Sequence, residues 1–168
     1  MTFSGPGLDD KLACLRLPEP TYAFGMAVDL LRLHKPFADF KFGRLASVIR
    51  TQIRRNHFVF TFRGSKPVGY AGWALCSHDI AKAWIERRYV PKYEDCLRGE
   101  YWVGITFYAE NREVTFFQSR YCRKLYPNAK VAFLRDYGGV RRRMTETVNR
   151  IRSDEPPAGN EPLLQDGT

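Results

Sequence analysis

The pattern of apolar and polar positions predicts two helices followed by a hairpin in the first half of the chain. Apolar residues recur at helical spacing over residues 22–33 and 40–55, and the second helix carries arginines on its other faces. Residues 57–63 alternate strictly, which places three phenylalanines on one face of a strand. The turn sequence Gly-Ser-Lys-Pro then leads into a predicted returning strand over residues 68–75.

The second half of the chain predicts helices and strands in alternation. Ser77 and Asn111 are expected to cap helices, the second of which covers residues 112–126, and residues 101–109 and 130–137 are expected to form strands. This order predicts an α/β fold of the α+β sandwich type, with a central, mostly antiparallel sheet flanked by helices and one parallel crossover.

Composition divides the chain into three parts. Residues 1–20 show no periodicity and are predicted to be an N-terminal extension, and residues 21–153 are predicted to form the folded domain. Residues 154–168 are rich in proline and acids, so we expect a disordered tail there.

Charge makes the choice of partner more specific. The chain has 27 Lys and Arg against 18 Asp and Glu, and residues 154–168 hold four of the acids and no base, so residues 1–153 carry a net charge of +13. Such a charge attracts nucleic acids, anionic membranes, phosphorylated cofactors or acidic proteins. No apolar run approaches the length of about 18 residues that a membrane helix needs, and the start shows no signal-peptide pattern, so a cytoplasmic protein is expected.

The sequence offers few candidates for chemistry. It contains no phosphate loop, nucleophile elbow or HExxH motif. Its four cysteines stand far apart without metal-ligand spacing, so we predict free thiols, with Cys76 and Cys122 in the core and neither metal nor bound cofactor. Catalysis would therefore depend on a histidine or on carboxylates in loops.

The segment HFVFTFRGSKPVGYAGWALCSHDIAKAWI, residues 57–85, resembles the central signature of the toxin-activating lysine acyltransferases, also called the hemolysin-activating family. The matching residues are Pro67, Val68, Tyr70, Trp73 and Ala74. Flanking features agree in order and distance, and the resemblance extends over residues 22–150. It implies a GNAT-like fold and transfer of a fatty acyl group from acyl carrier protein, or alternatively from acyl-CoA, to the ε-amine of a lysine in a protoxin or similar protein.

The resemblance also implies the catalytic positions. The family's essential histidine corresponds to His34, and an imidazole suits the removal of a proton from a lysine ammonium. The family's catalytic aspartate corresponds to Thr106, so the carboxylate is missing here. Either Thr106 substitutes by hydrogen bonding, or Glu100 or Glu110 reaches the site, or the acid-base pairing is altered. His57 is the alternative base, although its place at the start of a strand favours a structural role.

The predicted partner is acidic, as acyl carrier proteins are. Docking or substrate-binding residues are predicted on the basic helix and near the C-terminal end, together with two aromatic side chains: Arg50, Arg54, Arg55, Tyr70, Trp73, Arg141, Arg142 and Arg143. The alternative from another class is a nucleic-acid-binding domain, which would need Tyr70 or Trp73 to face outward and stack on bases. The resemblance additionally suggests a homodimer.

Overall fold

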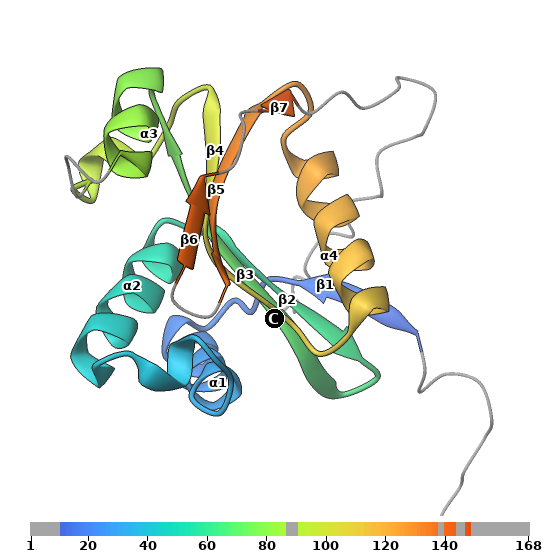
Figure 1. Ribbon diagram of the computed structural model, residues 1–168. Coiled ribbons are helices and arrows are strands. Elements are labelled where there is room, and N and C mark those ends of the chain that lie inside the picture. The colour runs from blue at the N-terminus through green and yellow to red at the C-terminus, as the bar shows by residue number, and fades with distance from the viewer. Residues whose placement is uncertain (1–10, 87–90, 138–139, 144–146, 149–168) are drawn as a thin grey trace, which may run out of the picture.

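Strands between residues 12 and 148 pair into one sheet. The computed structural model describes residues 11–86, 91–137, 140–143 and 147–148. Six strands lie side by side in the order β1 (Leu12–Leu15), β2 (Phe58–Arg63), β3 (Lys66–Cys76), β4 (Tyr101–Ala109), β5 (Lys130–Tyr137) and β6 (Val140–Arg143), and β7 (Thr147–Val148) pairs with β5 (Figure 1). All pairs are antiparallel except β4 with β5, which a helical crossover connects. The predicted mixed α/β class with a mostly antiparallel sheet is confirmed.

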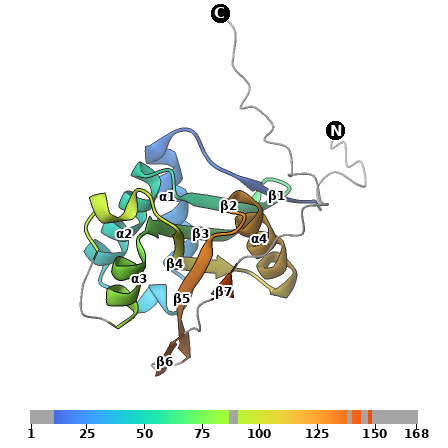
Figure 2. The same cartoon turned by 90° about the horizontal axis from the view of Figure 1, so that it is seen from above.

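Helices cover both faces of this sheet. The four helices are α1 (Pro20–Leu31), α2 (Phe42–Arg54), α3 (His78–Ile85) and α4 (Arg112–Leu125), and two short 3₁₀ turns are η1 (Phe37–Asp39) and η2 (Glu94–Cys96). The first three helices lie on one face and α4 lies on the other (Figures 1 and 2). The four helices predicted from the sequence are therefore all present, with ends shifted by a few residues.

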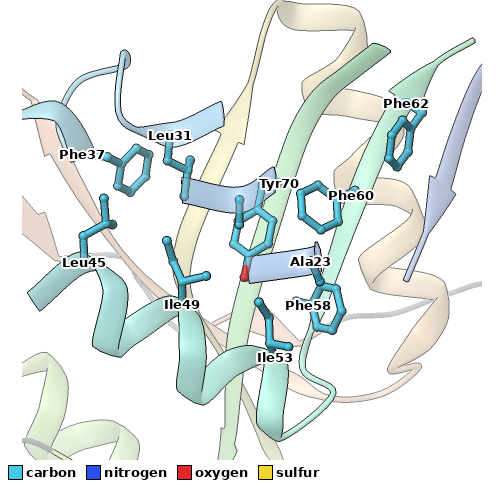
Figure 3. Packing of buried hydrophobic residues seen from close by; sticks show 11 residues of the cluster. Ala23, Leu31, Phe37, Leu45, Ile49, Ile53, Phe58, Phe60, Phe62 and Tyr70 are labelled. Atoms are coloured by element: carbon cyan, nitrogen blue, oxygen red, sulfur yellow. The ribbon is translucent and has the colours of Figure 1, made fainter. Parts of the chain in front are cut away.

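The alternation along β2 explains this two-sided packing. Phe58, Phe60 and Phe62 point toward α1 and α2 and form a cluster with aliphatic residues of those helices (Figure 3). Val59 and Thr61 point toward α4, where Thr61 donates a 2.7 Å hydrogen bond to Gln118. Because successive strand residues face opposite sides, one hairpin supplies core to both layers.

Short-range signals fix the helix starts. Ser77 caps α3 through the backbone of Ile80, and Asn111 caps α4 through the backbone of Val114, as the sequence predicted. The carboxylate of Glu19 accepts hydrogen bonds from the first turn of α1. Each cap satisfies donors that the helix itself leaves unpaired.

A bulge in β4 decides which side chains face the α1 and α2 layer. Gly72 pairs with Thr106 and Trp73 pairs with Gly104, so Ile105 is an extra residue in β4. Before the bulge, Val103 faces the layer that contains α3, and after it Thr106 faces the same layer. A regular strand would have placed Thr106 on the α4 side.

The parallel pair ends close to the same bulge. In the part of the chain that the structure describes, β4 pairs with β5 only from Tyr101 with Lys130 to Gly104 with Phe133. The rest of β4, from Ile105 to Ala109, continues along β3 while β5 continues along β6. The two strands therefore separate beyond Gly104.

The structure differs from the predicted domain boundary at the N-terminal side. Leu12–Leu15 form β1, which pairs with β2 although residues 1–20 were expected to be an extension. Four residues are too few to show a period, and this strand exists because the edge of β2 offers it a partner. The predicted tail, residues 154–168, lies outside the described residues. No helix among the described residues has the length and apolar character needed to cross a membrane.

Candidate functional site

His34 lies in the loop between α1 and η1, against the last part of β4. Its ring is half-buried and stacks on the Tyr108 ring, with centroids 4.2 Å apart and planes inclined by 21°. The backbone N–H of His34 donates to the carbonyl of Leu31, and its carbonyl accepts from the N–H of Ala38, both at 3.0 Å. The loop and the aromatic contact thus hold the imidazole in place while part of it remains open to a ligand.

Thr106 precedes Tyr108 by two residues and faces the same layer. Two strand residues span about 7 Å, so the structure brings the two positions implied by the resemblance, His34 and Thr106, to the same end of β4. The Thr106 side chain is only 2% exposed, however. It therefore lies in the interior, whereas the His34 ring is partly exposed.

A buried hydrogen-bond chain fixes Thr106. The Gln52 amide donates to the Thr106 hydroxyl at 2.9 Å, and the Tyr70 hydroxyl donates to the Gln52 carbonyl oxygen at 3.0 Å. Both Gln52 and Tyr70 are fully buried. A β-carbon at Gly72 would lie 2.0 Å from Gln52 Oε1, so glycine at this position leaves the room that Gln52 occupies.

Sequence reasoning missed Gln52. A signal was available, because Gln52 lies on the apolar face of α2 together with Leu45, Ile49 and Ile53. A glutamine at such a position is buried, and a buried amide needs hydrogen-bond partners. Nothing in the sequence identified Tyr70 and Thr106 as those partners.

Glu110 and Glu100 lie at opposite ends of β4. Glu110 forms an ion pair with Lys66, and together with burial, which is the larger cause, it raises the pKa of Tyr108. Glu110 therefore belongs to the electrostatic surroundings of the His34–Tyr108 stack. Glu100 precedes β4 and lies 3.7 Å from Lys130, about 25 Å along the strand from Tyr108. The structure does not bring Glu100 together with His34.

His57 lies in a different environment. Its side chain is 8% exposed, and its ring stacks on Trp73 with centroids 6.3 Å apart. Burial, followed by the charges of Arg55 and Arg16, lowers the pKa of His57 to about 4. Among the described residues its Nδ1 has no hydrogen-bond partner. This imidazole is neutral at neutral pH and packs inside the protein.

Two of the three docking arginines predicted on α2 and at its C-terminal cap already have partners. Arg55 is half-buried, donates to the carbonyl of Trp73 at 3.4 Å and lies over the Tyr93 ring. Arg54 is exposed, and its guanidinium also lies over Tyr93, 5.0 Å from the ring centroid. Arg50 is exposed. The three arginines therefore do not form one uniform docking face.

The remaining predicted site residues lie in the core or outside the described region. Tyr70 and Trp73 are both fully buried, so in this conformation they present no surface to a substrate or a nucleic-acid base. Arg141, Arg142 and Arg143 form β6, whose backbone pairs with β5, and their side chains lie outside the described part of the structure. The buried aromatic pair thus contributes to stability and not to a binding face.

The thiols are unsuited to nucleophilic chemistry. All four cysteines are free, and Cys76 and Cys122 are buried as predicted. Burial raises the pKa of each of these two thiols to about 12, so they stay protonated at neutral pH. Two imidazoles among the described residues are at least partly exposed and contact β4. His78 lies 2.8 Å from the Tyr101 hydroxyl, where β4 is still paired with β5, and His34 stacks on Tyr108, where β4 has separated from β5. Of the two, His34 is therefore the one beside the unpaired part of the strand.

The backbone beside His34 offers a second chemical feature. The edge of β4 that faces away from β3 is paired with β5 only up to Gly104, within the described residues. Backbone N–H and C=O groups at such an edge can bind an extended chain that carries amides. Ile105 and Phe107, on the same part of β4, are partly exposed, so apolar side chains also lie at this end of the strand.

This arrangement can hold an amide-containing, partly apolar ligand next to an imidazole. No model of a known protein family matches this chain, and a comparison with curated proteins gives no match either. The geometry of these residues is therefore the basis on which a function is proposed.

Proposed function

We propose that this protein is a lysine acyltransferase that moves a fatty acyl group from an acyl carrier protein to the ε-amine of a lysine in an acceptor protein. One observation carries the proposal: a half-buried histidine, His34, is stacked on Tyr108 of β4 at the end where β4 and β5 separate. The sequence resemblance supports the same histidine as the base.

The proposed reaction needs one proton acceptor. A lysine side chain is almost entirely ammonium at pH 7, because its usual pKa is about 10.4. The imidazole of His34 accepts one proton from the ammonium and passes it to water, and the freed amine attacks the thioester carbonyl carbon. The new C–N bond forms and the C–S bond breaks. The nitrogen loses its second proton as the amide forms, and the imidazole passes this proton to the departing thiolate, so the products are an amide, a thiol and one proton released to water.

The separated edge of β4 is suited to the arm that carries the acyl group. The phosphopantetheine arm of a carrier protein is extended and contains amides, which can pair with a strand edge as an added strand does. Ile105 and Phe107 lie on this part of β4 and are 36% and 39% exposed. An acyl chain that contacts these two side chains would be shielded from water, as a ligand is in an apolar pocket.

Thr106 acts in this proposal as a positioning residue. Its hydrogen bond with Gln52 fixes the strand two residues before Tyr108, and Tyr108 in turn supports the His34 ring. Because the Gln52 amide and the Thr106 hydroxyl are both neutral, this way of fixing the strand requires no carboxylate at position 106. Glu110, which follows Tyr108 by two residues, is the acidic group near this end of the strand.

The test is direct transfer. The full-length protein is incubated with palmitoyl acyl carrier protein or palmitoyl-CoA and a lysine-containing acceptor, and the acceptor mass is measured. Acyl transfer from the carrier protein supports the proposal, and transfer from CoA alone indicates a CoA-dependent acyltransferase. Absence of transfer from either donor, with tight and salt-sensitive oligonucleotide binding, would instead indicate a nucleic-acid-binding protein.

A further inference from the structure

The segment that carries His34 leaves large apolar side chains on the surface. Leu33 is 66% exposed and Phe42 is 68% exposed, and Phe40 between them is 36% exposed. In the same segment Phe37 is 7% exposed and packs in the core beside Leu31 and Leu45 (Figure 3). Burial of Phe37 fixes the segment on the domain, so the exposed neighbours are held in defined positions.

The same segment carries exposed cationic side chains. Lys35, Lys41 and Arg44 are exposed, and none of them is in an ion pair in the part of the chain that the structure describes. The Arg44 guanidinium lies over the Phe40 ring, 5.9 Å from its centroid. Asp39 is the one acid between residues 33 and 44. The segment therefore presents uncompensated positive charge next to apolar surface.

On the basis of the proposed function, we propose that this α1–α2 surface docks the acidic protein that delivers the acyl group. We define the α1–α2 surface as Leu33, Lys35, Phe40, Lys41, Phe42 and Arg44. An acidic partner complements the three cations, and the exposed phenylalanines supply the apolar contact that a specific interface needs at its centre. Docking here brings the donor to the loop that holds His34.

Charge and composition favour a protein partner over a membrane. Three cations are fewer than the four to eight basic residues that usually mark an anionic-lipid site. The apolar groups are separate side chains on a loop and a helix start, and they do not form one long amphipathic face. The docking position also differs from the one predicted on Arg50, Arg54 and Arg55, two of which already contact Tyr93.

Two double charge reversals on the same helix and its cap test the location. Lys41→Glu/Arg44→Glu changes the α1–α2 surface, and Arg50→Glu/Arg54→Glu gives the same change in net charge elsewhere on α2. Acidic residues suit the first turn of a helix, so the first pair does not weaken α2. Thermal unfolding measurements verify that both variants are folded.

Binding to an acyl carrier protein that carries its phosphopantetheine arm is measured by calorimetry at low and moderate salt. We expect the Lys41→Glu/Arg44→Glu variant to bind about tenfold more weakly or worse, and the Arg50→Glu/Arg54→Glu variant to stay within about twofold of the unchanged protein. The single variant Phe42→Ser should also weaken binding relative to the unchanged protein, and the salt dependence of its binding should change little. Equal effects of the two charge reversals, or no binding by the unchanged protein, would overturn the docking assignment.

Failure of this proposal is separable from failure of the proposed function. Carrier-protein binding that depends on Lys41 and Arg44 without any acyl transfer supports the docking surface and contradicts the enzyme. Transfer that is unaffected by the charge reversals supports the enzyme and contradicts the surface. Binding to vesicles of phosphatidylserine and phosphatidylcholine that is stronger than carrier-protein binding and is lost in Lys41→Glu/Arg44→Glu would assign the surface to a membrane.

Discussion

The two histidines considered as bases, His34 and His57, both stack on an aromatic residue of the sheet, yet they lie in opposite kinds of environment. His34 is half-buried in a loop, and its neighbour Tyr108 belongs to the part of β4 that has separated from β5. His57 is enclosed at the start of β2 against Trp73, between the positive charges of Arg55 and Arg16.

This difference bears on the choice of a base for the proposed reaction. A general base must reach the proton that it removes and must change its charge near neutral pH. His57 fails both requirements, because it is enclosed and because burial and nearby arginines keep its pKa at about 4. His34 is only half-buried, and its ring stacks on Tyr108, so in the proposed reaction it is the better placed of the two.

Replacement of His34 is expected to produce the largest effect on activity. His34→Ala should lower turnover by about 10² to 10⁴-fold, the usual range for the loss of a general base, with little change in the free energy of unfolding. The measurement is the rate of acyl transfer to the acceptor, followed by mass. Full activity in His34→Ala would contradict the assignment of the base, and unchanged carrier-protein binding is the control for folding.

Replacement of His57 should invert that pattern. His57→Ala removes an enclosed ring that contacts Trp73, and the cavity should lower the free energy of unfolding by about 2 to 4 kcal/mol. Turnover per folded molecule should change little. Denaturant unfolding and a transfer assay on the same sample test both statements, and a loss of turnover without a loss of stability would exchange the roles of the two histidines.

The pH dependence of stability offers a third comparison. Above pH 6.5 His57 is neutral in both the folded and unfolded states. As the pH falls below 6.5, the unfolded chain takes up a proton that the folded protein binds only near pH 4. The free energy of unfolding should therefore fall by about 3 kcal/mol between pH 6.5 and 4 through this group.

His57→Phe keeps an aromatic ring against Trp73 and removes the titrating group. In urea unfolding at a series of pH values, this variant should lack the contribution of His57 to the slope between pH 6.5 and 4. An identical slope in both proteins would show that His57 is not protonated on unfolding in this range.

The smallest effect is expected from the replacement of Thr106. Thr106→Val leaves the buried Gln52 amide without its partner, so the free energy of unfolding should fall by about 1 to 3 kcal/mol.

Thr106→Asp places a carboxylate in the same interior position, where Gln52 can donate one hydrogen bond to it. It should retain turnover because the carboxylate lies on the His34 side of the sheet, and it should cost stability. Loss of turnover in Thr106→Asp without unfolding would show a site built around a neutral residue, with Glu110 the next position to change.

Much of the fold was predictable because its signals are local. The alternation of residues 57–63, the cap residues Ser77 and Asn111, and the strand at 101–109 all appear in the structure. The short strand β1 was missed, since its four residues are ordered by β2 and not by their own pattern. Resemblance suggested His34, while its contact with Tyr108, 74 residues later in the chain, required the folded structure.

The sequence by itself determined the helices, the hairpin, the mostly antiparallel sheet and the excess of positive charge, because propensity, periodicity and capping depend on residues a few positions apart. The tertiary structure alone decided which way Thr106 faces, since the Ile105 bulge arises from the register with β3. It also decided that Tyr70 and Trp73 are core residues and that Gln52 joins Tyr70 to Thr106. Each of these outcomes depends on contacts between segments far apart in the chain, and such contacts leave no periodic trace in the sequence.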